Sequence, residues 1–168
     1  MAFSFLPSVI VDSITDLTPQ MLHERGIGLL MLDFDNTIVP YTTNVPTPAM
    51  EQWLRTMAAS DEIRICVVSN SRKDRVKIFC REYGIDCITH AKKPFHRGIR
   101  ECLDKYRMEP RQCALAGDQI YTDVLGARSA GLQAILVRAI HNHTIWLKLR
   151  HVAELPFIAM AHGRRLHK

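Results

Sequence analysis

Short apolar runs alternate along this chain with amphipathic stretches of helical period. The runs predict five strands, over residues 28–34, 63–68, 85–88, 113–116 and 134–137. The stretches between them predict helices over residues 48–59, from Ser71 to Gly84, and over residues 95–107 and 121–130. Strands that alternate with crossover helices indicate a parallel sheet covered on both faces, which is an α/β fold. No repeat or long linker divides the chain, so we expect a single domain over residues 1–168.

The first predicted strand ends in Asp33-Phe34-Asp35-Asn36-Thr37. Residues at i and i+2 of an extended segment point to the same side, so two carboxylates enter one small volume at the end of a buried strand. Their repulsion costs free energy unless a cation or a shared proton relieves it. This pattern therefore predicts an active site rather than a stabilising feature.

Polar residues also follow the other strands. Ser69-Asn70-Ser71 follows the second, Lys92-Lys93-Pro94 the third, and the segment from Gly117-Asp118 to Asp123 the fourth. In open α/β sheets the ligand site lies beyond the carboxyl ends of the strands, so these groups should meet at one edge. Carboxylate oxygens suit Mg²⁺. A lysine suits a phosphoryl group, as do the backbone amides of the helix start expected at Ser69-Asn70-Ser71. The combination predicts metal-assisted phosphoryl transfer.

Composition excludes several classes of protein. With 47% hydrophobic and 23% charged residues the chain is globular, and no apolar run approaches the length of a membrane-spanning helix. The N-terminus lacks the basic region of a signal peptide. The five cysteines form no Cys-x-x-Cys pair, so we expect reduced thiols and a cytoplasmic protein.

The net charge of +5 belongs to the C-terminal segment. Residues 138–168 carry six basic side chains and one acidic side chain, whereas residues 1–137 are balanced. Residues 144–168 mix this charge with apolar side chains. One interpretation is a terminal helix packed on the sheet. The other is peripheral docking on an anionic membrane at its inner face. Binding to nucleic acid is not favoured, because the segment lacks a platform of interleaved aromatic and basic residues beyond Trp146.

Four motifs follow the strands in order: Asp-x-Asp-x-Thr at 33–37, a serine at 69, a lysine at 93, and Gly-Asp-x-x-x-x-Asp at 117–123. Together they resemble the motifs of the haloacid dehalogenase (HAD) superfamily. The segments Val11–Leu17, Gly26–Gly28, Ala91–Pro94 and Gly117–Gln119 are further similar to the capless YqeG-type branch of subfamily IIIA, itself similar to mitochondrial phosphatidylglycerophosphate phosphatases. The resemblance implies a Rossmann-like sheet with its five strands in the order 5-4-1-2-3. It also implies a phosphatase that uses Mg²⁺ and an aspartyl-phosphate intermediate.

Roles for individual residues follow from the same resemblance. Asp33 would attack phosphorus, and Asp35 would protonate the leaving oxygen and then activate water. Ser69 and Lys93 would hold the phosphate, and Thr37 would orient the first motif. Mg²⁺ would be bound by the side chains of Asp33 and Asp118 and by the backbone carbonyl of Asp35.

Several assignments stay open from sequence alone. Lys92 is an alternative to Lys93, although the lysine directly before proline matches the motif better. Asp123 either contacts the metal or supports Lys93 from behind. Asn70 either contacts substrate or only makes a turn, and Ser71 is interpreted as a helix cap.

The spacing of the motifs bears on the substrate. Neither the interval from Asp33 to Ser69 nor that from Ser69 to Lys93 has room for a cap domain. An open site favours a large phosphorylated substrate, with phosphatidylglycerophosphate as one candidate. A sugar or nucleotide phosphatase whose lid comes from oligomerisation is the alternative. A phospho-receiver-like signalling domain and a non-catalytic phospho-ligand binding or assembly protein are the rivals from other classes.

Overall fold

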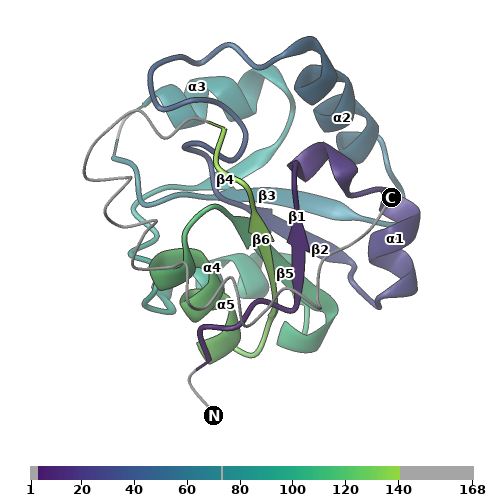
Figure 1. Ribbon diagram of the computed structural model, residues 1–168, viewed down its shortest axis with the longest axis vertical. Helices are drawn as coiled ribbons and strands as arrows, with labels where there is room; N and C mark the ends of the chain where they lie inside the picture. Colours follow the sequence, from purple (N-terminus) through teal and green to yellow (C-terminus); the bar gives the residue numbers. More distant parts are fainter. Residues whose placement is uncertain (1–3, 73, 141–168) are drawn as a thin grey trace.

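The computed structural model describes residues 4–72 and 74–140. Its strands form one parallel sheet in the order β1-β6-β5-β2-β3-β4 (Figure 1). The strands are β1 (Val9–Val11), β2 (Leu29–Leu32), β3 (Arg64–Val68), β4 (Asp86–Ile88), β5 (Cys113–Gly117) and β6 (Gln133–Val137). The α/β class and the relative order of the five predicted strands are confirmed.

The number of strands differs from the prediction, because the sheet has six strands instead of five. The additional strand β1 pairs in parallel with β6, with Val9 opposite Ile135 and Val11 opposite Val137. A segment of three residues is too short to show a strand pattern, and its partner lies at the other end of the described chain. This pairing therefore has no local signal in the sequence.

The helices are α1 (Pro19–Glu24), α2 (Pro48–Ala58), α3 (Arg75–Glu82), α4 (Arg97–Tyr106) and α5 (Leu125–Ser129), with short turns η1 (Ile14–Asp16), η2 (Pro110–Gln112) and the π-helical η3 (Ile120–Val124). The four predicted helices are present with changed bounds, the last one divided into η3 and α5, and α1 was not predicted. The prediction that Ser71 caps a helix is wrong, because α3 begins only at Arg75 and Asp74 occupies the cap position. The Ser71 amide instead donates to Ser69 Oγ at 3.0 Å.

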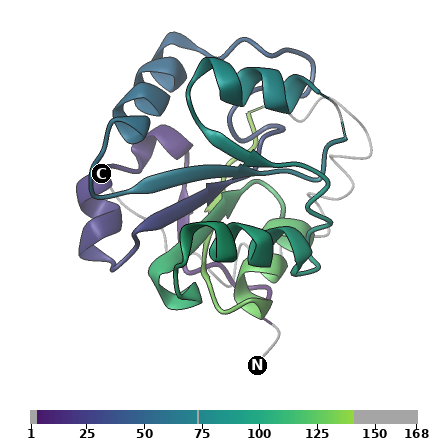
Figure 2. The ribbon, with the colours of Figure 1, turned by 180° about the vertical axis from the view of Figure 1, so that it is seen from behind.

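The sheet separates two layers of helices. Leu30 and Leu32 of β2 belong to the hydrophobic cluster under α2 and α3, whereas Leu29 and Met31 belong to the cluster under α4 and α5. Figures 1 and 2 show α2 and α3 on one side of the sheet and α4 and α5 on the other. Because both faces are covered, β2 is apolar at all of its positions, and a charged residue has a place only at its end.

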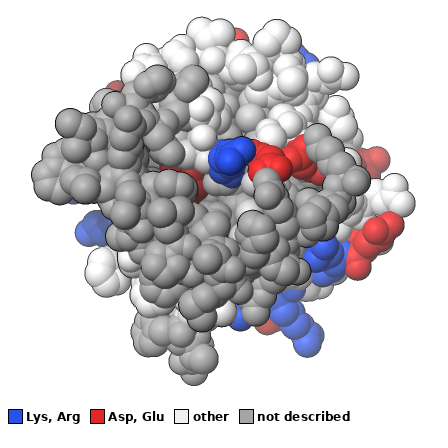
Figure 3. All heavy atoms as spheres, viewed as in Figure 1, with Lys and Arg blue, Asp and Glu red and all other residues white. Residues whose placement is uncertain are grey.

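Charges of both signs lie on the described surface. On the face shown in Figure 3, basic and acidic side chains lie next to one another near the middle of the view. This mixture agrees with the equal numbers of basic and acidic residues in residues 1–137. The predicted basic segment 144–168 lies outside the described residues. Among the described residues, no helix has the length and apolar character needed to cross a membrane.

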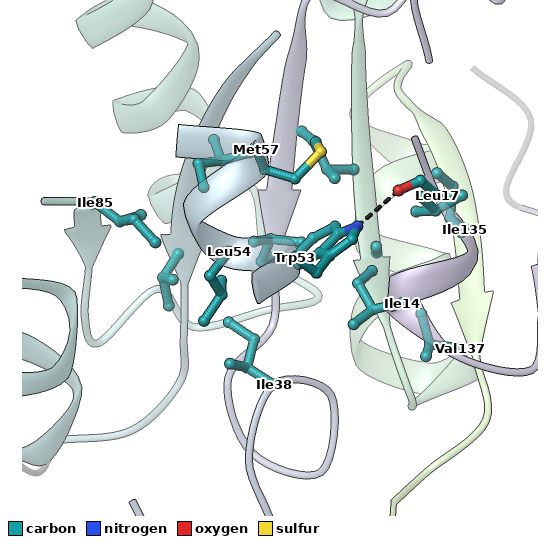
Figure 4. Packing of buried hydrophobic residues seen from close by; sticks show 14 of the residues in the cluster. Ile14, Leu17, Ile38, Trp53, Leu54, Met57, Ile85, Ile135 and Val137 are labelled. Atoms are coloured by element: carbon teal, nitrogen blue, oxygen red, sulfur yellow. Dashed lines mark hydrogen bonds between the residues drawn. The ribbon is translucent and has the colours of Figure 1, made fainter. Parts of the chain in front are cut away.

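The N-terminal segment is tied to α2 by Trp53. Its indole nitrogen donates a hydrogen bond of 2.6 Å to the carbonyl oxygen of Leu17, and its ring packs among buried side chains that include Ile14 and Leu54 (Figure 4). A buried indole requires such an acceptor for its N–H group. This contact and the β1–β6 pairing join the segment from Val9 to Leu17 to the core.

Candidate active site

The predicted site residues lie at the carboxyl edge of the sheet, as their positions after the strands require. Asp33 directly follows β2, and its amide donates to the carbonyl of Ala116 in β5 at 2.8 Å. Ser69 directly follows β3 and Asp118 directly follows β5. All three side chains are at most 9% exposed. The neighbouring strands therefore carry these polar groups to one buried place.

Lys93 connects two carboxylates at this place. Its ammonium lies 2.7 Å from Asp33 Oδ1 and 2.7 Å from Asp123 Oδ1, with only 1% of the lysine side chain exposed. Lys92, in contrast, is exposed. The structure therefore favours Lys93 over Lys92 as the lysine of the third motif.

Burial and charge set the protonation of this pair. Burial, only partly offset by the ammonium of Lys93, raises the pKa of the Asp33 carboxyl to about 6. Burial alone would lower the pKa of Lys93, but the charges of Asp123 and Asp33 outweigh it and hold the pKa above its ordinary value. At neutral pH Lys93 is therefore a fixed cation, and Asp33 is mostly ionised beside it.

Three carboxylates come close enough to share a metal ion. Asp33, Asp118 and Asp123 each offer an oxygen atom, and these atoms lie within 4.8 Å of one another. Asp123 also accepts a hydrogen bond of 3.1 Å from the backbone N–H of Gln119, in addition to its ion pair with Lys93. These two contacts suit a supporting position for Asp123.

Asn70 holds the backbone of Lys93 through two hydrogen bonds. Its Nδ2 donates to the Lys93 carbonyl at 2.9 Å, and its Oδ1 accepts from the Lys93 amide at 2.7 Å. Of the two open interpretations of Asn70, this geometry favours the structural one. Thr37 is 1% exposed, and its hydroxyl oxygen has no hydrogen-bond partner among the described residues.

Gly117 leaves the space that Asp123 occupies. A Cβ at residue 117 would lie 2.3 Å from Asp123 Oδ2 and 2.4 Å from its Cγ. Such distances are impossible, so any side chain at this position must displace the carboxylate that holds Lys93.

We therefore expect Gly117→Ala to lower the free energy of unfolding by about 1–3 kcal/mol, as overpacking does. The measurement is urea denaturation of both proteins. Gly28→Ala is the matched control, because the atom in its way is the flexible end of Met108, whose Cε lies 2.7 Å from the added Cβ. An equal loss of unfolding free energy in the two variants would contradict the claim that the Asp123 carboxylate is what excludes a side chain at residue 117.

Asp35 does not join the acidic cluster through its side chain. Its Oδ1 instead lies 2.7 Å from Nη2 of Arg75, the first residue of α3. Sequence analysis missed Arg75, which belongs to none of the four motifs. The available signal was its place: the N-terminus of a helix that follows a strand of a parallel sheet lies at the site edge.

Comparisons with known proteins find relatives of this chain among phosphatases. The family model described as mitochondrial PGP phosphatase matches residues 2–141. The chain is 35% identical over 133 residues to the probable phosphatase YqeG of Bacillus subtilis, covering 79% of this chain and 77% of that protein. It is 28% identical over 144 residues to the mitochondrial phosphatidylglycerophosphatase GEP4 of Saccharomyces cerevisiae, with the same 79% and 77% covered.

A solved structure supports the fold. A subfamily IIIA hydrolase of the HAD superfamily from Legionella pneumophila superposes with a TM-score of 0.54 at 11% identity, covering 84% of this chain and 93% of that one. The family match and the two relatives make the protein a phosphatase, an enzyme that acts on a phosphorylated substrate. The chain belongs to the mitochondrial PGP phosphatase family, is a relative of YqeG, and has the fold of the HAD-superfamily hydrolases.

Proposed function

We propose that the protein is a Mg²⁺-dependent phosphomonoesterase that forms an aspartyl-phosphate on Asp33. The observation that carries the proposal is the buried Lys93 ammonium at 2.7 Å from Asp33, beside the acidic cluster that includes Asp118. A buried carboxylate that is kept ionised next to a fixed cation is suited to attack phosphorus.

The residues present fit a divalent cation. Three carboxylates share the cluster, and a single lysine neutralises only one of their charges. Oxygen ligands are those that Mg²⁺ prefers. We assign Asp33, Asp118 and the backbone carbonyl of Asp35 as ligands, with Asp123 supporting Lys93. When bound, Mg²⁺ would neutralise charge on the phosphoryl oxygens.

The protein's own residues divide the two reaction steps between them. In the first, an Asp33 oxygen forms a bond to phosphorus, the bond from phosphorus to the leaving oxygen breaks, and Asp35 gives that oxygen its proton. In the second, water attacks phosphorus, its proton goes to Asp35, and the bond to Asp33 breaks to release inorganic phosphate. Lys93 and Ser69 hold the phosphoryl oxygens, and Thr37 orients the loop after β2.

For the substrate we propose a phospholipid phosphomonoester of the phosphatidylglycerophosphate type. The name of the family and that of the yeast relative support this class. The site's surroundings are compatible with it. Between Asp33 and Ser69 lie only a loop, α2 and β3, and the described residues between Ser69 and Lys93 form only α3, β4 and their connections. Neither interval holds a lid domain that would exclude a lipid.

Turnover should depend on the metal. We expect EDTA to lower phosphatase activity at least about 100-fold, because the clustered carboxylates and the phosphate would otherwise repel each other, and excess Mg²⁺ should restore it. The assay measures phosphate release from p-nitrophenyl phosphate at constant ionic strength. The control is the same titration with Na⁺ in place of Mg²⁺. Full activity after removal of the metal would contradict the metal assignment.

The substrate assignment has its own experiment. Phosphate release is compared for phosphatidylglycerophosphate in mixed micelles, glycerol 3-phosphate, a sugar phosphate and a nucleoside monophosphate. We expect the highest kcat/KM for the lipid. A higher value for a soluble phosphate would replace the lipid with a small metabolite, whereas no turnover of any substrate would favour a non-catalytic binding protein.

A further inference from the structure

Arg75 holds the carboxylate of Asp35 from outside the acidic cluster. Its Nη2 donates to Asp35 Oδ1 at 2.7 Å, and its Nη1 donates to the carbonyl oxygen of Tyr41 at 2.8 Å. The guanidinium carbon also lies 5.1 Å from the centre of the Phe34 ring and 5.8 Å from that of Tyr41. The arginine thus contacts three residues of the segment that follows β2.

These contacts fix the guanidinium without help from Asp35. The Phe34 ring is fully buried and packs edge-on against Phe79 of α3 with the centroids 5.2 Å apart, so it is a rigid support. The Tyr41 carbonyl sets the rotation of the guanidinium plane. Stacking on aromatic faces and directional N–H donors are properties that lysine lacks. The arginine is therefore a fixed template, and the Asp35 carboxylate takes its orientation from it.

Asp35 needs such a template more than Asp33 does. Asp33 is held at the end of a buried strand, whereas Asp35 lies where the chain leaves the sheet and its side chain is 21% exposed. The Arg75 side chain is only 14% exposed, so the ion pair is shielded from solvent and holds its geometry better than a surface pair.

We propose that Arg75 is the positioning residue for Asp35, and that it orients this carboxyl for proton delivery to the leaving oxygen. The inference rests on the proposed function, in which Asp33 forms the bond to phosphorus while the leaving-group bond breaks. Arg75 holds Oδ1, so the other carboxyl oxygen of Asp35 carries the proton that the second step returns to this residue. The proton moves from that oxygen to the departing oxygen, and the product is an alcohol. Arg75 itself exchanges no proton.

The proposal predicts an effect that depends on the leaving group. An alkoxide departs poorly without a proton, whereas p-nitrophenolate departs readily without one, so only the first needs a well-placed acid. General acid catalysis contributes about 10²–10⁴-fold. We expect Arg75→Met to lower kcat/KM for glycerol 3-phosphate by at least about 30-fold and for p-nitrophenyl phosphate by less than about 3-fold. We expect Arg75→Lys to give an intermediate loss for the alkyl substrate.

The control is Lys77→Met, which removes a positive charge from the same helix. Lys77 is an exposed residue whose ion pair is with Asp74, so both substrates should keep their wild-type kcat/KM. Thermal denaturation of each variant shows that it is folded. If Arg75→Met does not fold, the comparison is made with Arg75→Lys. This variant should lose more kcat/KM for glycerol 3-phosphate than for p-nitrophenyl phosphate.

A double-mutant cycle tests whether Arg75 acts through Asp35. In an Asp35→Asn background, Arg75→Met should lower kcat/KM for glycerol 3-phosphate no further. An equal loss for both substrates, no loss for either, or an additive loss in the double variant would overturn the assignment. Failure of the proposed function would give a different result: Asp33→Asn would then keep its activity toward both substrates.

Discussion

Replacing Asp33 with asparagine should lower turnover of p-nitrophenyl phosphate by more than about 10³-fold, because the nucleophile is lost while the shape of the side chain is kept. The neutral amide can neither form the acyl phosphate nor serve as an anionic metal ligand. The measurement is phosphate release at saturating Mg²⁺. Intact-mass spectrometry of acid-quenched enzyme should show a phosphoryl adduct in the wild type and none in the variant.

Asp104→Asn is the matched control for this loss. Asp104 is an exposed residue of α4, and the same change of one charge there should leave turnover unaltered. If Asp33→Asn kept wild-type activity in a preparation free of other phosphatases, the covalent mechanism would be wrong. A phosphoryl adduct found on another residue would move the nucleophile and leave the phosphatase assignment in place.

Replacing Lys93 with methionine should lower the free energy of unfolding by about 3–5 kcal/mol in EDTA. The ammonium is buried and contacts both Asp33 and Asp123 at 2.7 Å, so its removal leaves like charges in one cluster without a counter-charge. Urea denaturation measures the loss. Mg²⁺ should then stabilise this variant more than the wild type, because the cation becomes the only relief for the repulsion.

Lys92→Met is the control, because it removes the same charge from the adjacent, exposed residue. Its free energy of unfolding should stay within about 0.5 kcal/mol of the wild-type value. Equal destabilisation by the two substitutions would show that net charge matters and that the buried contacts do not. Wild-type stability of Lys93→Met in EDTA would contradict the claim that Lys93 offsets the repulsion between the clustered carboxylates.

The sequence allowed the central part of the fold to be predicted, because its signals are local. The four strands β2, β3, β5 and β6 consist mostly of apolar residues that are buried on both faces, a pattern visible within a few residues. Strand β1 was missed because its evidence is a partner that lies more than a hundred residues away. The start of α3 was misplaced because Ser71 has the residue type of a cap, while its amide makes a turn with Ser69.

The site shows the same division between local and distant information. The positions of the motifs after the strands predicted that Asp33, Ser69 and Asp118 would lie at one edge, and the structure places them there. The contact between Arg75 and Asp35 depends on the path of the loop after β2 and on an aromatic support, neither of which has a sequence pattern. The place of Arg75 after the second predicted strand indicates the edge of the sheet, but it does not indicate Asp35 as the partner.

The amide of Asn70 imitates a peptide group. By donating to one backbone atom of Lys93 and accepting from another, it adds to the main-chain hydrogen bonds that join the segments after β3 and β4, such as the one from the Ala91 amide to the Ser69 carbonyl. The position of the Lys93 ammonium therefore depends on a backbone that Asn70 holds in place. Anyone who transplants this centre into a different parallel sheet would have to carry the asparagine along with the charged groups.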